Sequence, residues 1–114
     1  MTDGKFVTRG ILFDVNKASL KPESMGVINQ VAKLMKKHPE LNFSIEGHTD
    51  SDGDETMNQQ LSEKRSESVK LALVDLGIEK SHFQIKGFGE SKPVDSNSSP
   101  EGKANNRRVE FVKF

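Results

Sequence analysis

The sequence contains no cysteine, no tryptophan and no tyrosine among its 114 residues. Without cysteine, the fold has no disulfide, no thiolate metal ligand and no thiol nucleophile. Seven phenylalanines are its only aromatic side chains, so the chain is short of the stacking platforms that binders of single-stranded nucleic acid use. Nucleic acid is therefore not expected as a partner.

The chain also lacks a charge excess and a long apolar run. Seventeen basic residues balance seventeen acidic ones, so any charge-based recognition must be local. No segment is apolar over the length of a bilayer, and no signal-type hydrophobic core follows Met1, so we expect no membrane insertion by this chain. The length fits one domain with a small core. We expect residues 1–9 to be an N-terminal tail or remnant and residues 10–114 to form the domain.

Hydrophobic periodicity predicts alternating strands and helices along the chain. The segment 87–106, rich in Gly, Ser, Asn and Pro, is predicted to be a long loop, and a turn is expected at 16–19. This order predicts an α+β fold, a two-layer α/β sandwich with a βαβαββ-type mixed sheet and two main helices on one face. The predicted strands are Gly10–Val15, Leu41–Ile45, a strand from Phe83 and Val109–Phe114; the predicted helices are Pro22–Lys37 and Glu55–Leu76.

An arginine lies on the apolar stripe of the second predicted helix. From Leu61, steps of four residues lead to Arg65, Val69 and Leu73. A guanidinium is costly to bury without a carboxylate, a backbone acceptor or a bound anion. The alternative is that Arg65 extends past the edge of the core into water.

Asp50 is the nearest candidate partner for Arg65, because it follows a predicted strand and its loop leads into the helix. Asp14 leaves the first predicted strand, taken as parallel, so we expect Asp14, Asp50 and Arg65 to share one rim of the sheet. A fixed anion beside a fixed cation suits a zwitterion such as an amino-acid head group. A structural ion pair with nothing bound is the open alternative.

Four motifs in order along the chain carry a resemblance to a known family: FDVNKASLKP, IEGHTDSDGDETMNQQLSEKRSESV, GFGESKPV and EGKANNRRVEF. From Ile11 onward the chain resembles the OmpA-like C-terminal domain of porin tails, Pal lipoproteins and flagellar MotB stators. The resemblance implies non-catalytic, noncovalent binding of the peptidoglycan stem peptide through meso-diaminopimelate. It further implies a periplasmic module that tethers an outer-membrane-associated protein to the cell wall, and no cofactor is expected.

The resemblance also implies roles for individual residues. Asp50 would hold the ammonium of diaminopimelate and Arg65 its carboxylate. Phe13 and Asp14 would lie at the pocket wall, with backbone groups facing the ligand carboxylate. Further binding positions implied are Thr49, Asn58 and Leu61, with Arg107 and Arg108 supporting the pocket floor and the last strand. A solvated basic turn is the alternative for at least one of the last two arginines.

The acidic residues of this region are also compatible with two other functions. Asp50, Asp52 and Asp54 alternate like the start of a calcium loop, but position twelve is Leu61 where a glutamate is required, which excludes an EF-hand. A looser cation site on these carboxylates, or on His48 with Asp50, stays open; we expect His48 to face solvent or cap a turn. A cell-wall hydrolase with Asp14 and Asp50 as paired carboxylates is the enzymatic alternative, although Arg65 beside them would lower their pKa values.

Overall fold

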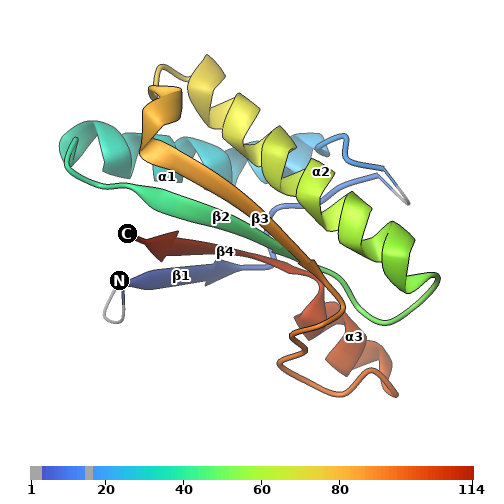
Figure 1. Cartoon of the computed structure of the whole chain (residues 1–114). Helices are drawn as coiled ribbons and strands as arrows, with labels where there is room; N and C mark the ends of the chain where they lie inside the picture. Colours follow the sequence, from blue (N-terminus) through green and yellow to red (C-terminus); the bar gives the residue numbers. More distant parts are fainter. Residues whose placement is uncertain (1–3, 15–16) are drawn as a thin grey trace.

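The computed structural model describes residues 4–14 and 17–114. Within that part of the chain, four strands form one mixed sheet in the order β1-β4-β2-β3. Strand β2 runs parallel to β3 and antiparallel to β4, and β4 is antiparallel to β1 at the edge (Figure 1). The strands are β1 (Lys5–Thr8), β2 (Phe43–His48), β3 (Phe83–Gly89) and β4 (Arg108–Lys113).

Two long helices cover one face of this sheet (Figure 1). Helix α1 (Met25–Lys37) follows a 3-10 turn at Pro22–Ser24, and α2 (Glu55–Asp75) connects the parallel strands β2 and β3. A second 3-10 turn, Lys80–His82, precedes β3, and a third helix, α3 (Pro100–Asn106), lies beyond one end of the sheet. The predicted α+β class, with its mixed sheet and two main helices on one face, is confirmed. No helix in the described ranges is long and apolar enough to cross a membrane.

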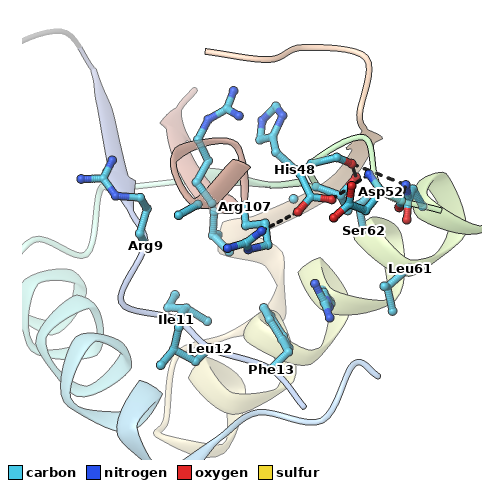
Figure 2. Close-up of a pocket in the computed structure, with 17 residues that line it drawn as sticks. Arg9, Ile11, Leu12, Phe13, His48, Asp52, Leu61, Ser62 and Arg107 are labelled. Atoms are coloured by element: carbon cyan, nitrogen blue, oxygen red, sulfur yellow. Dashed lines mark hydrogen bonds and ion pairs between the residues drawn. The ribbon is translucent and has the colours of Figure 1, made fainter. Parts of the chain in front are cut away.

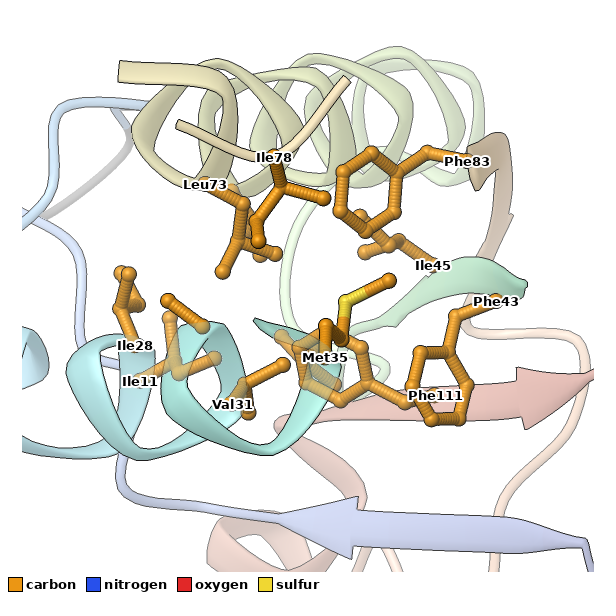
Figure 3. Close-up of a cluster of buried hydrophobic side chains, with 13 residues drawn as sticks. Ile11, Ile28, Val31, Met35, Phe43, Ile45, Leu73, Ile78, Phe83 and Phe111 are labelled. Atoms are coloured by element: carbon orange, nitrogen blue, oxygen red, sulfur yellow. The ribbon is translucent and has the colours of Figure 1, made fainter. Parts of the chain in front are cut away.

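The core fills the space between the two helices and the sheet (Figure 3). Alternation along β2 and β4 turns one side chain in two toward the helices, and Ile45 and Phe111 are 0 % and 1 % exposed. Ile28 of α1 and Leu73 of α2 meet them, both fully buried. These contacts fix the position of α2 over the ends of β2 and β3, where the site described below is found.

Helix α2 approaches the sheet through small side chains in its N-terminal half. Ser62 and Ser66 are buried against Gly47 and Gly87, which are register partners on β2 and β3. A methyl group added at Gly47 would lie 2.6 Å from the carbonyl oxygen of Ser62. The buried stripe of α2 therefore begins with serines, and Arg65 lies beside this stripe, half-buried, rather than in its centre.

Two predicted segments differ from the structure. The predicted strand at Gly10–Val15 is wrong within its described residues, 10–14, which make only an isolated bridge from Phe13 to Leu20; Val15 and Asn16 lie outside the described residues. The edge strand is instead Lys5–Thr8, inside the expected tail. Since β4 lies between this strand and β2, the expectation that the first strand is parallel to β2 and next to it is also wrong. The predicted loop 87–106 contains α3, which Ser99 caps by accepting a hydrogen bond from the Gly102 N–H.

Candidate functional site

A cavity of about 580 Å³ opens where β2 ends, between α2, α3 and the segment that follows β1 (Figure 2). Its wall combines apolar side chains with charges of both signs. The segment after β1 contributes Arg9, Ile11, Leu12 and Phe13; β2, α2 and the loop between them contribute Gly47, His48, Thr49, Asp50, Asp52, Asn58, Leu61, Ser62 and Arg65; the C-terminal part contributes Ala104, Arg107, Arg108 and Val109.

Asp50 provides a buried carboxylate just past the end of β2. Its Oδ1 accepts a hydrogen bond of 2.9 Å from the Asp52 N–H, and its Oδ2 is paired with the guanidinium of Arg107. The Thr49 hydroxyl donates to the Asp50 carbonyl over 2.8 Å. Asn58 on α2 donates to the Asp52 carbonyl over 2.9 Å, which ties the loop to the helix. Backbone and side-chain contacts therefore fix the direction of this carboxylate.

Arg65 provides a cation at the wall of the same cavity, and neutral groups hold its side chain. Its Nε donates to the Lys17 carbonyl over 2.9 Å, Nη2 lies 3.4 Å from the Asp14 carbonyl, and its Cζ lies 4.7 Å from the centre of the Phe13 ring. No ion pair joins Arg65 to a carboxylate of the described residues. Burial lowers the pKa of Arg65, Asp50 raises it, and Arg107 lowers it, with a net decrease. An anion entering the cavity would therefore stabilise the charged guanidinium.

Most of the sequence-predicted site residues line this one cavity. Asp50 and Arg65 do so without being paired to each other, which differs from the simple Asp–Arg ion pair weighed from the sequence. Those lining it alongside them are Phe13, Thr49, Asn58, Leu61, Arg107 and Arg108.

Asp14 is placed differently from the expectation. Its carboxylate accepts a hydrogen bond of 2.6 Å from the Ser19 hydroxyl, and it is not among the cavity-lining residues. Only its carbonyl takes part, through Arg65. The Asp14 carboxylate is therefore not part of the cavity wall, and the geometry does not support a hydrolase that pairs it with Asp50.

The carboxylates of the acidic loop already have partners. Asp50 is paired with Arg107, Asp52 lies 3.1 Å from the Lys103 ammonium, and Asp54 caps α2 by accepting from the Thr56 N–H. These contacts argue against a cation site on the loop.

His48 is buried, contrary to the expectation that it faces solvent. Its ring stacks on Phe88 with centroids 5.2 Å apart and points away from Ile11, Leu12 and Phe13 in Figure 2. It lies near Glu46 and Glu110, on the sheet face opposite the helices, rather than with the Asp50 carboxylate.

The cluster around His48 balances its own charge. Lys5 and Arg108 contact the two carboxylate oxygens of Glu110 at 3.1 and 2.7 Å. Burial raises the pKa of Glu110, but the bonds from Arg108 and Lys5 outweigh it and lower the pKa overall. Arg108 is thus a buried support of β4 that also touches the cavity.

Protonation of His48 is expected to destabilise the fold. Burial, followed by repulsion from Arg108, lowers its pKa from 6.5 to about 4, so the unfolded chain binds a proton more readily than the folded chain between these values. The free energy of unfolding should therefore decrease as the pH falls from 6.5 toward 4, by on the order of 2 kcal/mol from this group. Urea denaturation at pH 7 and pH 5 measures the effect.

His48→Phe should flatten this pH dependence. Neither ring nitrogen of His48 has a hydrogen-bond partner among the described residues, so phenylalanine keeps the ring without removing such a bond. His38→Gln, at a largely exposed histidine, is the matched control and should keep the wild-type slope. An unchanged slope in His48→Phe would contradict the assignment.

Sequence reasoning missed several cavity residues, both outside and inside the recognised motifs. Arg9 lies in the expected tail, and Asp52, Ser62 and Ala104 were given no place in the site.

The sequence contains a signal for the start of α3 in Ser99-Pro100-Glu101, since serine before proline is typical of a helix N-terminus. Asn106 at the end of α3 orders the preceding segment by accepting from the Val94 and Asp95 N–H groups.

Comparison with known proteins identifies the family. Residues 12–107 match the OmpA family. The chain belongs to the OmpA family. The resemblance read from the motifs is thereby confirmed.

Relatives of this OmpA-family chain cover most of its length. "Probable lipoprotein YiaD" of Escherichia coli is 40% identical over 102 residues, 90% of this chain and 47% of that protein. "Peptidoglycan-binding protein ArfA" of Mycobacterium tuberculosis is 41% identical over 107 residues, 93% of this chain and 33% of that protein. The chain thus spans about half of one relative's length and a third of the other's. The crystal structure of the peptidoglycan-associated lipoprotein from Burkholderia pseudomallei matches with a TM-score of 0.82 at 31% identity, over 91% of this chain and 88% of that chain.

Proposed function

We propose that this chain binds peptidoglycan noncovalently, by holding the zwitterionic end of meso-diaminopimelate in a stem peptide between Asp50 and Arg65. In this role it acts without catalysis and tethers a larger protein to the cell wall. The single observation that carries the proposal is that these opposite charges line one cavity and are not paired with each other.

The cavity offers complementary groups to each end of an amino-acid zwitterion. The Arg65 guanidinium is oriented by the Phe13 ring and the Lys17 carbonyl, which are neutral, so its charge is left for a ligand carboxylate. The Asp50 carboxylate accepts from the ligand ammonium in the same cavity. Leu61, Ile11 and Leu12 provide apolar wall for the methylene chain between the two centres of diaminopimelate.

The relatives support the same role. A protein named for peptidoglycan binding matches most of this chain in sequence, and a structure of a peptidoglycan-associated lipoprotein shares its fold. We place the tethered chain in the periplasm, near the outer membrane, since a lipoprotein and porins are among its relatives. The Asp14 carboxylate is bonded to Ser19 and does not line the cavity with Asp50, which favours binding over hydrolysis.

Stem peptides with different third residues test the proposal. A tripeptide with lysine in place of diaminopimelate keeps the side-chain ammonium for Asp50 but lacks the carboxylate beside that ammonium, which Arg65 would bind. Leaving the half-buried guanidinium unpaired should weaken binding by about tenfold or more, as measured by isothermal titration calorimetry. Equal affinity for the two tripeptides would contradict the proposed contact.

A second measurement separates binding from catalysis. Peptidoglycan fragments incubated with the protein should show no new product by mass spectrometry. Time-dependent cleavage would instead favour the hydrolase.

A further inference from the structure

Cations outnumber the carboxylates that face this cavity. Arg9, Arg65 and Arg107 all line it, whereas Asp52 is already neutralised by Lys103 at 3.1 Å. Among the described residues, Asp50 is the remaining carboxylate that lines the cavity, and it is paired with Arg107. The site therefore holds a surplus of positive charge before any ligand enters.

The ion pair between Asp50 and Arg107 occupies the position where the ligand ammonium is proposed to bind. Both carboxylate oxygens of Asp50 already accept a hydrogen bond, Oδ1 from the Asp52 N–H and Oδ2 from Arg107. The Asp52 N–H is part of the loop backbone. The contact from Arg107, in contrast, comes from the end of a long side chain that is 49% exposed. Arg107 follows α3, whose end is anchored by Asn106, so its side chain can move without disturbing the helix. Arg107 is thus the group that an incoming ammonium displaces.

We propose that Arg107 is a specificity-determining residue that exchanges partners on binding: it leaves Asp50 to the ligand ammonium and takes a second ligand carboxylate. This inference rests on the proposed function. When a ligand has a free zwitterionic centre and a second carboxylate, its ammonium pairs with Asp50 and the second carboxylate pairs with the displaced Arg107. A ligand that is only a zwitterion displaces Arg107 from Asp50 but provides no anion for it.

The second carboxylate defines the preferred form of the ligand. In a stem peptide, one centre of diaminopimelate is acylated and the other is the free zwitterion. The acylated centre has a free carboxylate only where the stem ends at diaminopimelate. The exchange therefore favours stems that end at this residue over stems in which that carboxyl is part of an amide.

Arg107 is better placed for this exchange than Arg9. In Figure 2 the Arg107 side chain lies among the cavity residues and is joined by a dashed line to a carboxylate, whereas Arg9 extends away from Asp52 and Leu61. Because Arg107 is half exposed, water moderates the cost of leaving it unpaired. The expected preference is therefore several-fold rather than absolute.

Two small probes and one variant test the exchange. The probes are meso-diaminopimelate acetylated on one amine, with the carboxyl of the acetylated centre either free or amidated. Wild type should bind the free acid about three- to fivefold more tightly than the amide. In Arg107→Gln the amide should bind several-fold more tightly than it binds wild type, because Asp50 is uncovered, and the free acid should lose its advantage. Lys64→Gln, which removes an exposed cation of α2 that does not line the cavity, should keep the wild-type preference.

The outcomes distinguish this inference from the proposed function. If both probes bind wild type and Arg107→Gln changes their affinities in the same direction by the same factor, Arg107 exchanges no partner and this inference alone is overturned. Loss of the preference in Arg9→Gln but not in Arg107→Gln would overturn it as well. If neither probe binds wild type, the proposed function fails and this inference fails with it. A thermal melt of each variant confirms that it is folded.

Discussion

Replacing Arg65 with alanine is expected to weaken binding of a tripeptide stem ending in meso-diaminopimelate by about 100-fold or more, equivalent to about 2.7 kcal/mol. The loss is large because the half-buried guanidinium would make charge-assisted bonds to the ligand carboxylate that alanine cannot make. Isothermal titration calorimetry gives the dissociation constants. Arg65→Lys should recover only part of the affinity, since an ammonium keeps the charge but loses the planar fork.

Lys64→Ala is the matched control for this loss. It removes the same charge one residue earlier on α2, at an exposed position that does not line the cavity, and should change the affinity by less than about twofold. Asp50→Ala should also lose most of the binding, since it removes the acceptor for the ammonium. Undiminished binding by Arg65→Ala or by Asp50→Ala would remove the proposed mechanism.

The parts of the fold with strong periodicity could be predicted from the sequence. Helix α2 begins at the predicted residue, Glu55, and its predicted last residue, Leu76, is the C-cap. Strand β2 was predicted from alternation over Leu41–Ile45 and lies at Phe43–His48. Hydrophobic side chains that recur at a fixed spacing carry this information locally, so it does not depend on which strand pairs with which.

The edge strand and the first apolar run could not be predicted in the same way. The segment GILFDV has the composition of a strand, and its Ile11 is buried while Leu12 is 43% exposed, as alternation would predict. Neither residue, however, pairs with a strand of the sheet. Strand β1 has four residues and is mostly exposed, so it gives almost no periodic signal. Its place is set by pairing with β4, about a hundred residues away, as between Lys5 and Val112. Such long-range pairing is absent from any local window.

The site shows the same division between local and long-range information. Asp50 and Arg65 could be related because one loop and one helical stretch separate them. Arg107 was expected only to support the pocket floor, and its ion pair with Asp50 joins residues 57 apart in the sequence. In the N-terminal half of α2 the buried face is also shifted by one residue from the predicted stripe, whereas Val69 and Leu73 are buried as predicted. Serines at 62 and 66 are buried because the glycines of β2 and β3 let the helix come close, and a count of apolar residues does not detect this packing.

Gly47→Ala is expected to reduce the free energy of unfolding by on the order of 3 kcal/mol, the upper part of the range for overpacked cores. The added methyl group would lie 2.6 Å from the Ser62 carbonyl oxygen and 2.8 Å from the Ser66 hydroxyl. The first of these is backbone and cannot rotate away, so α2 must move off the sheet. Because α2 carries Leu61 and Arg65, the same shift should weaken ligand binding as well. Urea denaturation measures the first effect and calorimetry the second.

Gly26→Ala is the control that separates this contact from a general effect of removing glycine. Gly26 lies in the first turn of α1, and a methyl group there would meet nothing within 4 Å. Alanine at this exposed helical position should leave stability unchanged or raise it by up to about 1 kcal/mol. The two substitutions add the same atom, so opposite signs can come only from the space available at each site. If Gly47→Ala were as harmless as Gly26→Ala, the close approach of α2 to β2 would not hold, and neither would the position it gives to Arg65 at the cavity wall.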